Sequence, residues 1–547
     1  SQIGMVLGTI VFVNAGTQLA AIDSASGILT PALLGSFVAL GLMPWAARWI
    51  MGMIKRRRVY AGFTRPKRYD RNLIVIGAGA AGLVSAYIAA TVKAKVTLVE
   101  SHKMGGDCLN FGCVPSKALI KSAKVAADMR HAARYGLKDA PVALDFREVL
   151  ARVRAVITAI EPHDSVERFT GLGVDCVEGH ATIIDPWTVR IQSRAGTVHE
   201  LTTRSIVIAA GAAPFVPPIP GLGDIDFLTS DTLWDKLADR EKPPERLAIL
   251  GGGPIGCELA QAFARLGSNV TVIEMADQLL PREDRDVADE VRKSLESEGI
   301  TVLTGHECVA ARGGQLTSKS TAGETQISFD DLIVAVGRAA RLSGYGLEAL
   351  GIDTARTVTT DAWLTTKFPN IYAAGDVAGP YQLTHVASHQ AWFATVNALF
   401  GTFKRFKADY SVIPATTFTD PEVARVGLNE REAAAQGIAC EVTRYGLDDL
   451  DRAIADSAAR GFVKVLTVPG KDRILGATIV GAQAGEMLGE FVLAMKKKIG
   501  LGAILGTIHA YPTMIEGNKY AAGEWRRARA PERLIGWVAR YHDWRRG

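Results

Sequence analysis

The stretch that decides the fold is NLIVIGAGAAG, residues 72–82, in which a short apolar run ends directly in Gly77-Ala-Gly79-Ala-Ala-Gly82. An alanine-rich stretch with a helical pattern follows, and a second apolar run then ends in Glu100. Strand, glycine turn, helix, strand and acid stand in the order that a dinucleotide-binding fold requires. The glycines let the backbone approach a pyrophosphate at the helix N-terminus, and Glu100 is placed to hydrogen-bond a ribose.

The same arrangement occurs a second time. An apolar run leads into Gly251-Gly-Gly253-Pro-Ile-Gly256, a helical pattern follows, and the next strand ends in Glu274. The acid stands eighteen residues after the third glycine in both copies. Two complete copies predict two dinucleotides, which we interpret as one bound flavin, FAD, and one exchanging nicotinamide nucleotide.

Glu274 also bears on which nicotinamide nucleotide is used. A carboxylate accepts a hydrogen bond from the 2′-hydroxyl of NAD and repels the 2′-phosphate of NADP. NAD is therefore favoured, and NADP stays open because Arg282 and Arg285 are close in sequence.

A cysteine pair follows the first glycine turn. Residues 105–117 read GGDCLNFGCVPSK, with four residues between Cys108 and Cys113. Half of a zinc site is one reading, but no second ligand pair has suitable spacing and His102 stands alone. We favour a redox-active dithiol beside a flavin. The run after Pro115 is predicted to be helical, which places Cys113 near a helix N-terminus, where a thiolate is stabilised.

Together these motifs resemble the class I pyridine nucleotide-disulfide oxidoreductases, which include dihydrolipoamide dehydrogenase, glutathione reductase and mercuric reductase. The resemblance runs from about residue 69 to about residue 520. The similar segments are the redox-disulfide signature at 105–117, a second flavin motif at 371–376 (IYAAGD), two links between domains at 208–211 and 336–338, and the start of a dimerisation domain at 413–422.

The resemblance implies an enzyme in which electrons pass from NAD(P)H through FAD to a Cys108–Cys113 disulfide. Cys113 is then the flavin-side thiolate that forms a charge-transfer contact, and Cys108 is the outer thiol that meets the substrate. Lys117 and Glu258 match positions near the flavin ring, and for Glu258 a surface helix carboxylate is the alternative. The resemblance also implies cofactor contacts at Gly106, His180, Ala181, Gly211, Gly337, Gly375 and Asp376, the last on the ribityl chain.

One segment departs from the pattern of disulfide-reducing members. Those members carry a His-Pro-Thr motif whose histidine comes from the partner subunit as the acid–base for the outer thiol, oriented by a following glutamate. Here residues 509–516 read HAYPTMIE, so that Glu516 is present and Tyr511 takes the place of the histidine. A phenol with a pKa of about 10 is a poor base at neutral pH. His509 is two residues away and is expected to point elsewhere.

Mercuric reductases also carry a tyrosine at this position, and a soft metal ion held between thiolates needs no proton relay. Two features differ from a full mercuric reductase pattern. Asp107 stands where threonine is common, and no cysteine follows Cys440, whereas mercuric reductases carry a C-terminal cysteine pair that hands over the metal. The leading hypothesis is a mercuric-reductase-like flavoprotein. Dihydrolipoamide dehydrogenase and a membrane-tethered electron-transfer or redox-sensing module stay open as alternatives.

The expected fold class is α/β, with two Rossmann-like dinucleotide-binding domains and a C-terminal α+β dimerisation domain behind an apolar, membrane-associated helical N-terminal segment. The expected partners are a second copy in a homodimer and a small-molecule or metal-ion electron acceptor. No nucleic acid is expected, because the net charge of +5 comes from a local patch at 55–71 with eight basic residues and one acidic residue. The expected parts are 1–68 (membrane segment and linker), 69–215 (FAD, first part), 216–340 (NAD(P)), 341–410 (FAD, second part), 411–525 (dimerisation) and 526–547 (basic tail).

The N-terminal segment predicts a membrane anchor. Residues 28–54 are apolar and long enough to cross a hydrocarbon layer of ~30 Å, and Lys55-Arg-Arg-Arg58 follows at once. The positive-inside rule then places the enzyme in the cytoplasm, tethered to the inner face of the cell membrane. Residues 12–34 resemble the end of a DedA-like membrane domain, and an apolar helix pair packed on the enzyme is the alternative. The Arg-rich tail from Arg526 is interpreted as a solvated helix face, with a contact to anionic lipid as the alternative.

Overall fold

The computed structural model describes residues 57–547 without a break, preceded by residues 13, 16–17, 35, 38, 41–43 and 51–54. The predicted membrane span at 28–54 and the DedA-like stretch at 12–34 fall mostly outside these residues, so both stay predictions. Within the described part of the chain, no helix is both long enough and apolar enough to cross a bilayer.

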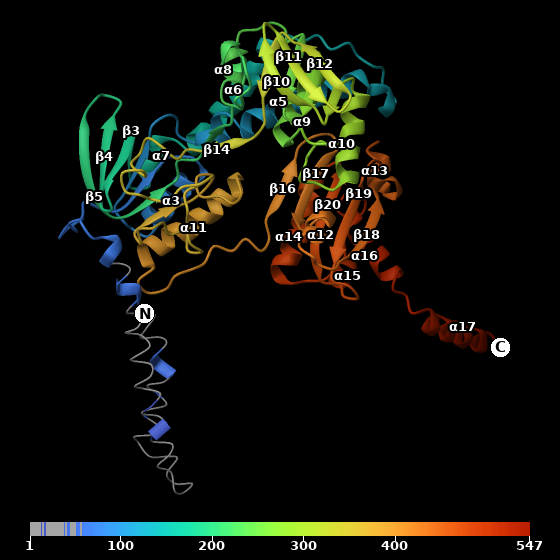
Figure 1. Ribbon diagram of the computed structural model, residues 1–547. Coiled ribbons are helices and arrows are strands. Elements are labelled where there is room, and N and C mark those ends of the chain that lie inside the picture. The colour runs from blue at the N-terminus through green and yellow to red at the C-terminus, as the bar shows by residue number, and fades with distance from the viewer. Residues whose placement is uncertain are drawn as a thin grey trace.

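The first dinucleotide unit is built on a parallel sheet of order β3-β2-β1-β5-β15. Residues 73–76 of the central strand are buried, as expected for a parallel strand covered on both faces. α3 and α11 pack side by side against this sheet (Figure 1). The elements are β1 (Arg71–Ile76), α3 (Ala80–Thr91), β2 (Val96–Glu100), β3 (Val174–Asp185), β4 (Thr188–Ser193), which joins β3 to β5 antiparallel, β5 (Val198–Ile208), β15 (Ile371–Ala373) and α11 (Thr384–Phe400).

The second unit repeats the topology of the first. Its four strands are all parallel in the order β13-β7-β8-β9, so the strand that leads into the glycine turn again lies inside the sheet. The short strands that continue the two predicted links, β6 after 208–211 and β14 from the end of 336–338, form an antiparallel pair. The elements are β6 (Ala212–Pro214), β7 (Arg246–Leu250), α9 (Pro254–Arg265), β8 (Asn269–Glu274), α10 (Arg285–Ser297), β9 (Thr301–Thr304), the antiparallel β10 (Glu307–Arg312), β11 (Gln315–Ser320) and β12 (Gly323–Ser328), then β13 (Asp331–Val334) and β14 (Arg338–Ala340).

α5 (Cys113–Arg130) ties the two units together. It packs against α6 (Phe146–Ile160) on one side and against α9 of the second unit on the other. Leu119, Phe146 and Phe263, one from each helix, are fully buried in one continuous core. Burying a side chain of this size stabilises a fold by roughly 1.5–3 kcal/mol. The helix that begins at Cys113 is therefore clamped between two domains.

The C-terminal domain is an antiparallel sheet of order β16-β17-β20-β19-β18 with helices on it (Figure 1). α17 projects beyond it at the end of the chain. The elements are β16 (Pro414–Thr417), β17 (Glu422–Gly427), α12 (Glu430–Ala435), β18 (Glu441–Gly446), α13 (Asp451–Ala455), β19 (Phe462–Thr467), β20 (Ile474–Gly481), α14 (Ala484–Lys497), α15 (Leu501–Gly506), α16 (Glu516–Arg527) and α17 (Glu532–Arg546).

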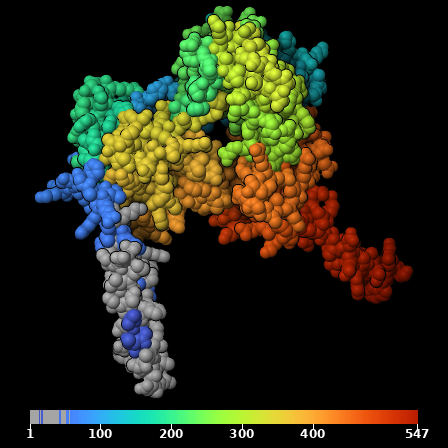
Figure 2. Space-filling view, viewed as in Figure 1, coloured from blue at the N-terminus to red at the C-terminus, as the bar shows by residue number. Residues whose placement is uncertain are grey.

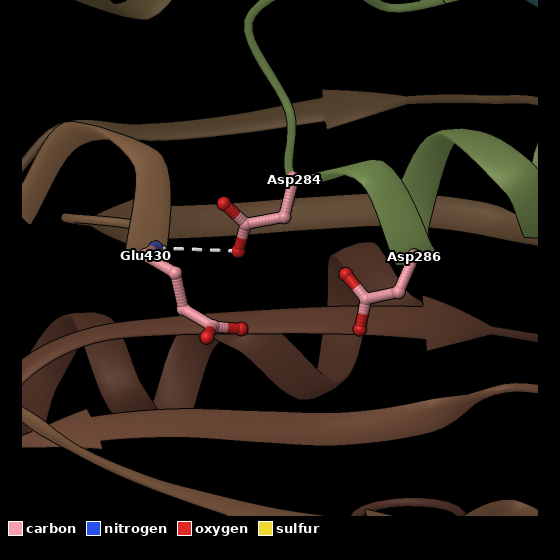
Figure 3. Close-up of side chains that lie close together, drawn as sticks. All are labelled: Asp284, Asp286 and Glu430. Carbon is pink, nitrogen blue, oxygen red and sulfur yellow. Dashed lines mark hydrogen bonds between the residues drawn. The ribbon is translucent and has the colours of Figure 1, made fainter. Parts of the chain in front are cut away.

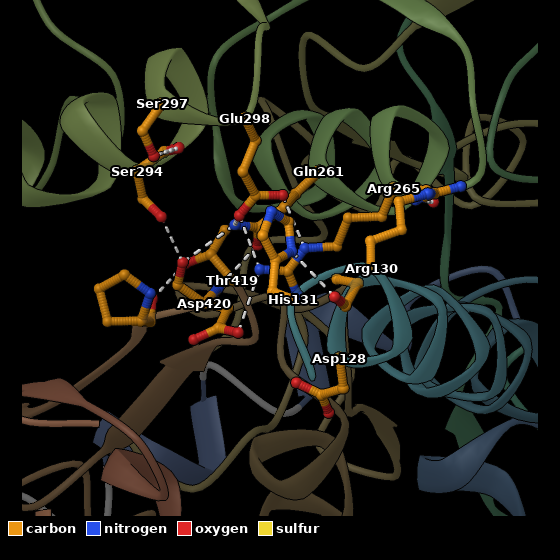
Figure 4. Close-up of polar contacts among 12 residues, drawn as sticks. Asp128, Arg130, His131, Gln261, Arg265, Ser294, Ser297, Glu298, Thr419 and Asp420 are labelled. Carbon is orange, nitrogen blue, oxygen red and sulfur yellow. Dashed lines mark hydrogen bonds and ion pairs between the residues drawn. The ribbon is translucent and has the colours of Figure 1, made fainter. Parts of the chain in front are cut away.

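A polar network joins this domain to the second unit (Figure 4). Gln261 of α9 exchanges two hydrogen bonds with the backbone of Asp420, at 2.7 and 2.9 Å. Arg265, one turn further on, pairs with Glu298 at 2.6 Å and with the Asp420 carboxylate at 3.0 Å. α9 thereby holds the loop that follows β16. The same loop takes part in the candidate active site described below.

A buried lysine makes the second connection between these parts. The carboxylates of Asp284, Asp286 and Glu430 converge as if around a metal ion (Figure 3). The Lys464 Nζ lies 2.9, 2.7 and 2.8 Å from them, and its side chain is 2% exposed. The ammonium group therefore already supplies the positive charge at this point.

Replacing the lysine should destabilise the protein. Lys464→Met leaves the buried Asp284 carboxylate without its lysine partner, so we expect the free energy of unfolding to fall by about 3 kcal/mol, measured by urea denaturation at neutral pH. The pKa of Asp284 is lowered, with Lys464 among the causes, although burial opposes the shift. The stabilisation is thus present above the unfolded pKa of about 4 and is lost as pH falls, so the two proteins should converge in acid.

Lys293→Met is the matched control. Lys293 is an exposed residue of α10 whose ion pair with Glu290 spans three residues at 3.0 Å. Exposed pairs of this kind contribute little, so its loss should leave stability nearly unchanged. Equal effects of the two substitutions would contradict a special role for Lys464.

Candidate active site

Both glycine turns have the same construction. Gly77 and Gly251 adopt left-handed φ values of +98° and +112°, and a Cβ on either would lie 2.4–2.5 Å from a backbone carbonyl oxygen. A Cβ on Gly82 or Gly256 would lie 1.7 or 1.9 Å from the carbonyl oxygen of the first glycine of its own turn. No other residue fits these four positions, as a dinucleotide turn requires. The middle glycines are the residues directly before α3 and α9.

The two acids also occupy equivalent positions. Glu100 accepts hydrogen bonds from the amides of Ala78 and His102 at 2.6 and 2.7 Å. Glu274 accepts from Gly252 and Ala276 at 2.6 and 2.7 Å. Each carboxylate first braces its own glycine turn, and its oxygens keep lone pairs for a ribose hydroxyl.

A cavity of about 960 Å³ opens at the first turn. Its walls come from the turn, the cysteine-bearing segment, β3 and the two motifs at 208–211 and 371–376. Most of the residues predicted to contact the flavin line it: Gly77, Gly79, Glu100, Gly106, Cys108, His180, Ala181, Gly211, Gly375 and Asp376. Gly82 lies beneath the turn, and Gly337 accepts a backbone hydrogen bond from Phe215 at the links.

Two observations show that this cavity fits FAD. A Cβ on Gly106 would lie 2.6 Å from the Gly79 Cα, so the cysteine-bearing loop packs directly on the glycine turn, and both backbones border the cavity without a side chain in the way of a pyrophosphate. Burial raises the pKa of the Asp376 carboxyl, and no described residue donates a hydrogen bond to it. Hydroxyl groups of a ribityl chain would supply the donors that a buried carboxylate requires.

The cysteines lie where two helices meet. Cys108 belongs to the short α4 (Gly106–Asn110), and Cys113 is the first residue of α5, as predicted. The Cys113 Sγ lies 3.6 Å from the Thr384 hydroxyl at the start of α11. The pKa of the Cys113 thiol is lowered to about 6, chiefly because Cys108 hydrogen-bonds to it; Thr384 and the Lys117 charge act in the same direction, against burial. The same hydrogen bond and burial raise the pKa of Cys108.

Lys117, one turn after Cys113 on α5, forms an ion pair with the buried Glu258. The Lys117 Nζ lies 2.7 Å from the Glu258 carboxylate and 4.5 Å from the centre of the Phe418 ring. The other Glu258 oxygen accepts from the Phe418 amide at 2.8 Å. Glu258 is 5% exposed, which overturns the alternative reading of a surface carboxylate. The pair connects α5, α9 and the C-terminal domain.

The sequence interpretation missed two contacts at this site. Thr384 stands 271 residues from Cys113 and carries no motif of its own. Asp107, noted only as a departure from the family pattern, forms an ion pair with Arg338 of the second link. Arg338 also donates to the Ala212 carbonyl at 3.0 Å. The only indication in the sequence was that an unusual acid, Asp107, and an arginine, Arg338, stand in two separate motifs of the family. Their spacing in the sequence does not show that they contact each other.

The C-terminal segment does not reach the cysteines of its own chain through any contact among the described residues. Tyr511 is 67% exposed, and its hydroxyl donates to Asp451 at 2.9 Å. This carboxylate raises the pKa of Tyr511. Glu516 begins α16 and accepts from the Thr513 amide at 3.0 Å.

His509 points away from Tyr511, as expected from the two-residue offset. Its side chain is almost fully covered, and its Nε2 lies 2.9 Å from the Glu490 carboxylate. Its other ring nitrogen faces the Thr507 carbonyl at 3.1 Å. Within the described C-terminal domain this histidine is thus held in place by structural contacts.

Comparison with known families and sequences agrees with this geometry. The family profile of the pyridine nucleotide-disulphide oxidoreductases matches residues 71–391, and the profile of their dimerisation domain matches residues 413–522. The chain is 34% identical over 446 residues to a dihydrolipoyl dehydrogenase of Chlamydia pneumoniae, covering 81% of this chain and 94% of that one. It is 31% identical over 469 residues to a mercuric reductase of Staphylococcus aureus, covering 84% and 83%.

Solved structures are similar over the same region. LpdA from Mycobacterium tuberculosis superimposes with a TM-score of 0.75 at 26% identity, covering 84% of this chain and all of the other. The Cu(II) complex of the HOCl-induced flavoprotein disulfide reductase RclA from Escherichia coli gives a TM-score of 0.72 at 28% identity, covering 82% and 99%.

Removing the Thr384 hydroxyl should weaken the Cys113 thiolate. Because the hydroxyl favours the charged form, Thr384→Val is expected to move the thiol pKa upward from about 6, and Thr384→Ser to leave it near the original value. The thiolate fraction just below neutral pH, and with it the alkylation rate, should then drop by about threefold. The measurement is the pH dependence of iodoacetamide labelling of the dithiothreitol-reduced protein, with Cys113 followed by peptide mass spectrometry. Identical profiles for valine and threonine would contradict this role.

Proposed function

The chain belongs to the pyridine nucleotide-disulphide oxidoreductases, flavoproteins that use FAD and NAD(P) and assemble as homodimers, and from this premise we propose that its electron acceptor is a soft metal ion. FAD, when bound, supplies the two-electron transfer between NAD(P)H and the cysteine pair. The chain contributes the sulfur atoms and their electrostatic setting, and the choice of acceptor depends on those.

The observation that carries the proposal is the state of Tyr511. Reduction of a disulfide substrate needs an acid–base group that removes the proton from the outer thiol and protonates the leaving sulfur. The pKa of Tyr511 is raised by Asp451, so its hydroxyl stays protonated at neutral pH. In the homodimer we place Tyr511 of the partner subunit beside Cys108, where it is a hydrogen-bond donor and a poor base.

A metal ion makes smaller demands on this site. Soft cations bind thiolates strongly, and coordination itself displaces the thiol proton. Cys108 and Cys113 then give up two electrons and form a disulfide, while one mercuric ion takes both electrons or two cupric ions take one each. The relatives named mercuric reductase and the neighbour solved as a Cu(II) complex support this class of acceptor.

Dihydrolipoamide is the second candidate substrate. It is favoured by the relatives named dihydrolipoyl dehydrogenase, of which one is 35% identical over 467 residues. A dithiol substrate also needs a base at the outer cysteine, so this reading depends on a group other than Tyr511. His509 is unsuited to that role because it is already bonded to Glu490.

For the nicotinamide nucleotide we propose NAD over NADP. Glu274 ends β8 at the ribose position, and the next residues are Met275 and Ala276, which offer no positive charge. Arg285 is paired with Asp277 and Asp289, so it is already neutralised. A 2′-phosphate would therefore meet the Glu274 carboxylate, and of the two arginines close in sequence only Arg282 has no carboxylate partner among the described residues.

Attachment to a membrane through residues 28–54 is a separate proposal that is supported by the sequence pattern alone. It keeps open a role in which the flavoprotein serves a membrane process as an electron-transfer or redox-sensing module. The proposed division into parts at 68, 215, 340, 410 and 525 likewise follows the sequence, and β6 and β14, which end the parts 69–215 and 216–340, pair across the limit at 215.

The acceptor is tested by exchanging the tyrosine. Rates of NADH and NADPH oxidation by the purified dimer are compared with Hg²⁺, Cu²⁺, lipoamide, glutathione disulfide and a quinone as acceptors. We expect metal-ion turnover in the original protein and little with lipoamide. Tyr511→His should raise lipoamide turnover by about a hundredfold, the lower range of general acid–base catalysis, and leave the metal-ion rate within a few-fold.

Tyr511→Phe is the control, because it removes the hydroxyl without supplying a base and should not raise lipoamide turnover. Rapid lipoamide turnover by the unchanged protein would instead identify it as a dihydrolipoamide dehydrogenase. Loss of metal-ion reduction in Cys108→Ser, with NAD(P)H-dependent flavin bleaching retained, would show that the rate depends on the cysteine pair.

A further inference from the structure

The last helix of the chain packs against no other element of the described part of the structure. α17, Glu532–Arg546, is described from end to end, and none of its residues is buried. The hydrogen bonds, ion pairs and ring contacts of its side chains, such as Arg546 to Asp543 and Tyr541 to Trp544, lie within the helix itself. It stands clear of the C-terminal domain as the red tail in Figures 1 and 2.

Most of the large apolar side chains of this isolated helix share one side. Leu534, Trp537, Val538, Tyr541 and Trp544 recur at intervals of three and four residues, which places them along one face. The two tryptophans are 71% and 77% exposed. Large apolar side chains at this exposure are costly in water. Contiguous exposed apolar surface on a protein mostly marks an interaction site.

The charge around this face is strongly positive. Residues 526–547 contain seven arginines, no lysine and two acids, Glu532 and Asp543. By helical spacing Arg533 and Arg540 fall on one flank of the apolar face and Arg546 on the other. Arg545, four residues after Tyr541, falls at the C-terminal end of the face itself. Tryptophan and tyrosine rings on one side with arginines at the flanks are the composition of a helix that lies in a lipid headgroup layer.

We propose that α17 binds the surface of a bilayer containing anionic lipid, with its axis in the plane of the headgroups and the Trp537–Trp544 face inserted. Charge complementarity selects this occupant over a second copy of the chain, since two such tails would bring arginines against arginines. Arginine pairs with lipid phosphate through two donors at once, which suits it to this contact better than lysine. The inference depends neither on the metal-ion acceptor nor on residues 28–54.

The test must separate α17 from any other membrane contact of the full chain. Hydrogen–deuterium exchange read by mass spectrometry does so, because each peptide reports on its own segment. The full-length protein is measured alone, with phosphatidylcholine vesicles, and with vesicles of phosphatidylcholine and phosphatidylglycerol. Peptides covering 531–547 should exchange about tenfold more slowly with the anionic vesicles only, and peptides from α10 should be unchanged. High salt should weaken the protection.

Substitutions test whether the slower exchange depends on the Trp537–Trp544 face of α17. The Trp537→Ser, Trp544→Ser protein should lose the protection, and Arg540→Gln, Arg545→Gln, Arg546→Gln should reduce it. Trp392→Ser, which removes a tryptophan that is 41% exposed on α11, is the matched control and should retain it. NADH oxidation in solution should be the same for all of them.

Three results would overturn the inference. Unchanged exchange of 531–547 with anionic vesicles would show that α17 does not bind them. Equal protection by neutral vesicles would remove the anionic recognition. Protection in the absence of vesicles that grows with protein concentration would show that a second copy covers the face.

Discussion

The packing of α5 between α6 and α9 is the interaction on which the site depends. The helix begins at Cys113, and its buried side chains, with Leu119 at the centre, lock it against the second dinucleotide unit. Once this helix is fixed, its N-terminus presents Cys113 next to the Thr384 hydroxyl, and its second turn presents Lys117 to Glu258. Apolar burial is nonspecific by itself. Here it fixes α5, and it thereby brings the Cys113 sulfur to Thr384 and Lys117 to Glu258.

The features that could be predicted from the sequence are those whose geometry is local. A glycine turn needs its three glycines within six residues, and the acid that braces it follows at the end of the next strand, so both dinucleotide units and the helical position of Cys113 were predictable. Glu258 could be placed near the flavin only through the family resemblance, and its burial between Lys117 and the Phe418 amide was not predictable from a helical pattern. The N-terminal prediction at 28–54 lies mostly outside the described residues and is not decided by the fold.

The contacts that could not be predicted join residues that are far apart in the chain. Thr384 meets Cys113 across 271 positions, and Asp107 meets Arg338 across 231. A single threonine or aspartate has no periodicity and no fixed spacing to its partner, so only the fold brings them together. Lys464 is a further case. Nothing in the sequence links this lysine of β19 to the acids at the start of α10 and α12, and they meet only because these three elements converge.

If the acceptor is a soft metal ion, as proposed, the electrostatics of the cysteine pair also explain why no base is needed. The arrangement makes one sulfur, Cys113, a thiolate and keeps the other, Cys108, protonated by the same hydrogen bond. A disulfide or dithiol substrate must react at Cys108, so it needs a group that takes that proton and returns it. A soft cation attracted to the Cys113 thiolate binds Cys108 next, and the energy of the metal–sulfur bond drives the proton into water without a relay. In the proposed function, a hydroxyl such as that of Tyr511, which donates a hydrogen bond and does not accept the proton, is then sufficient at the outer side of the site.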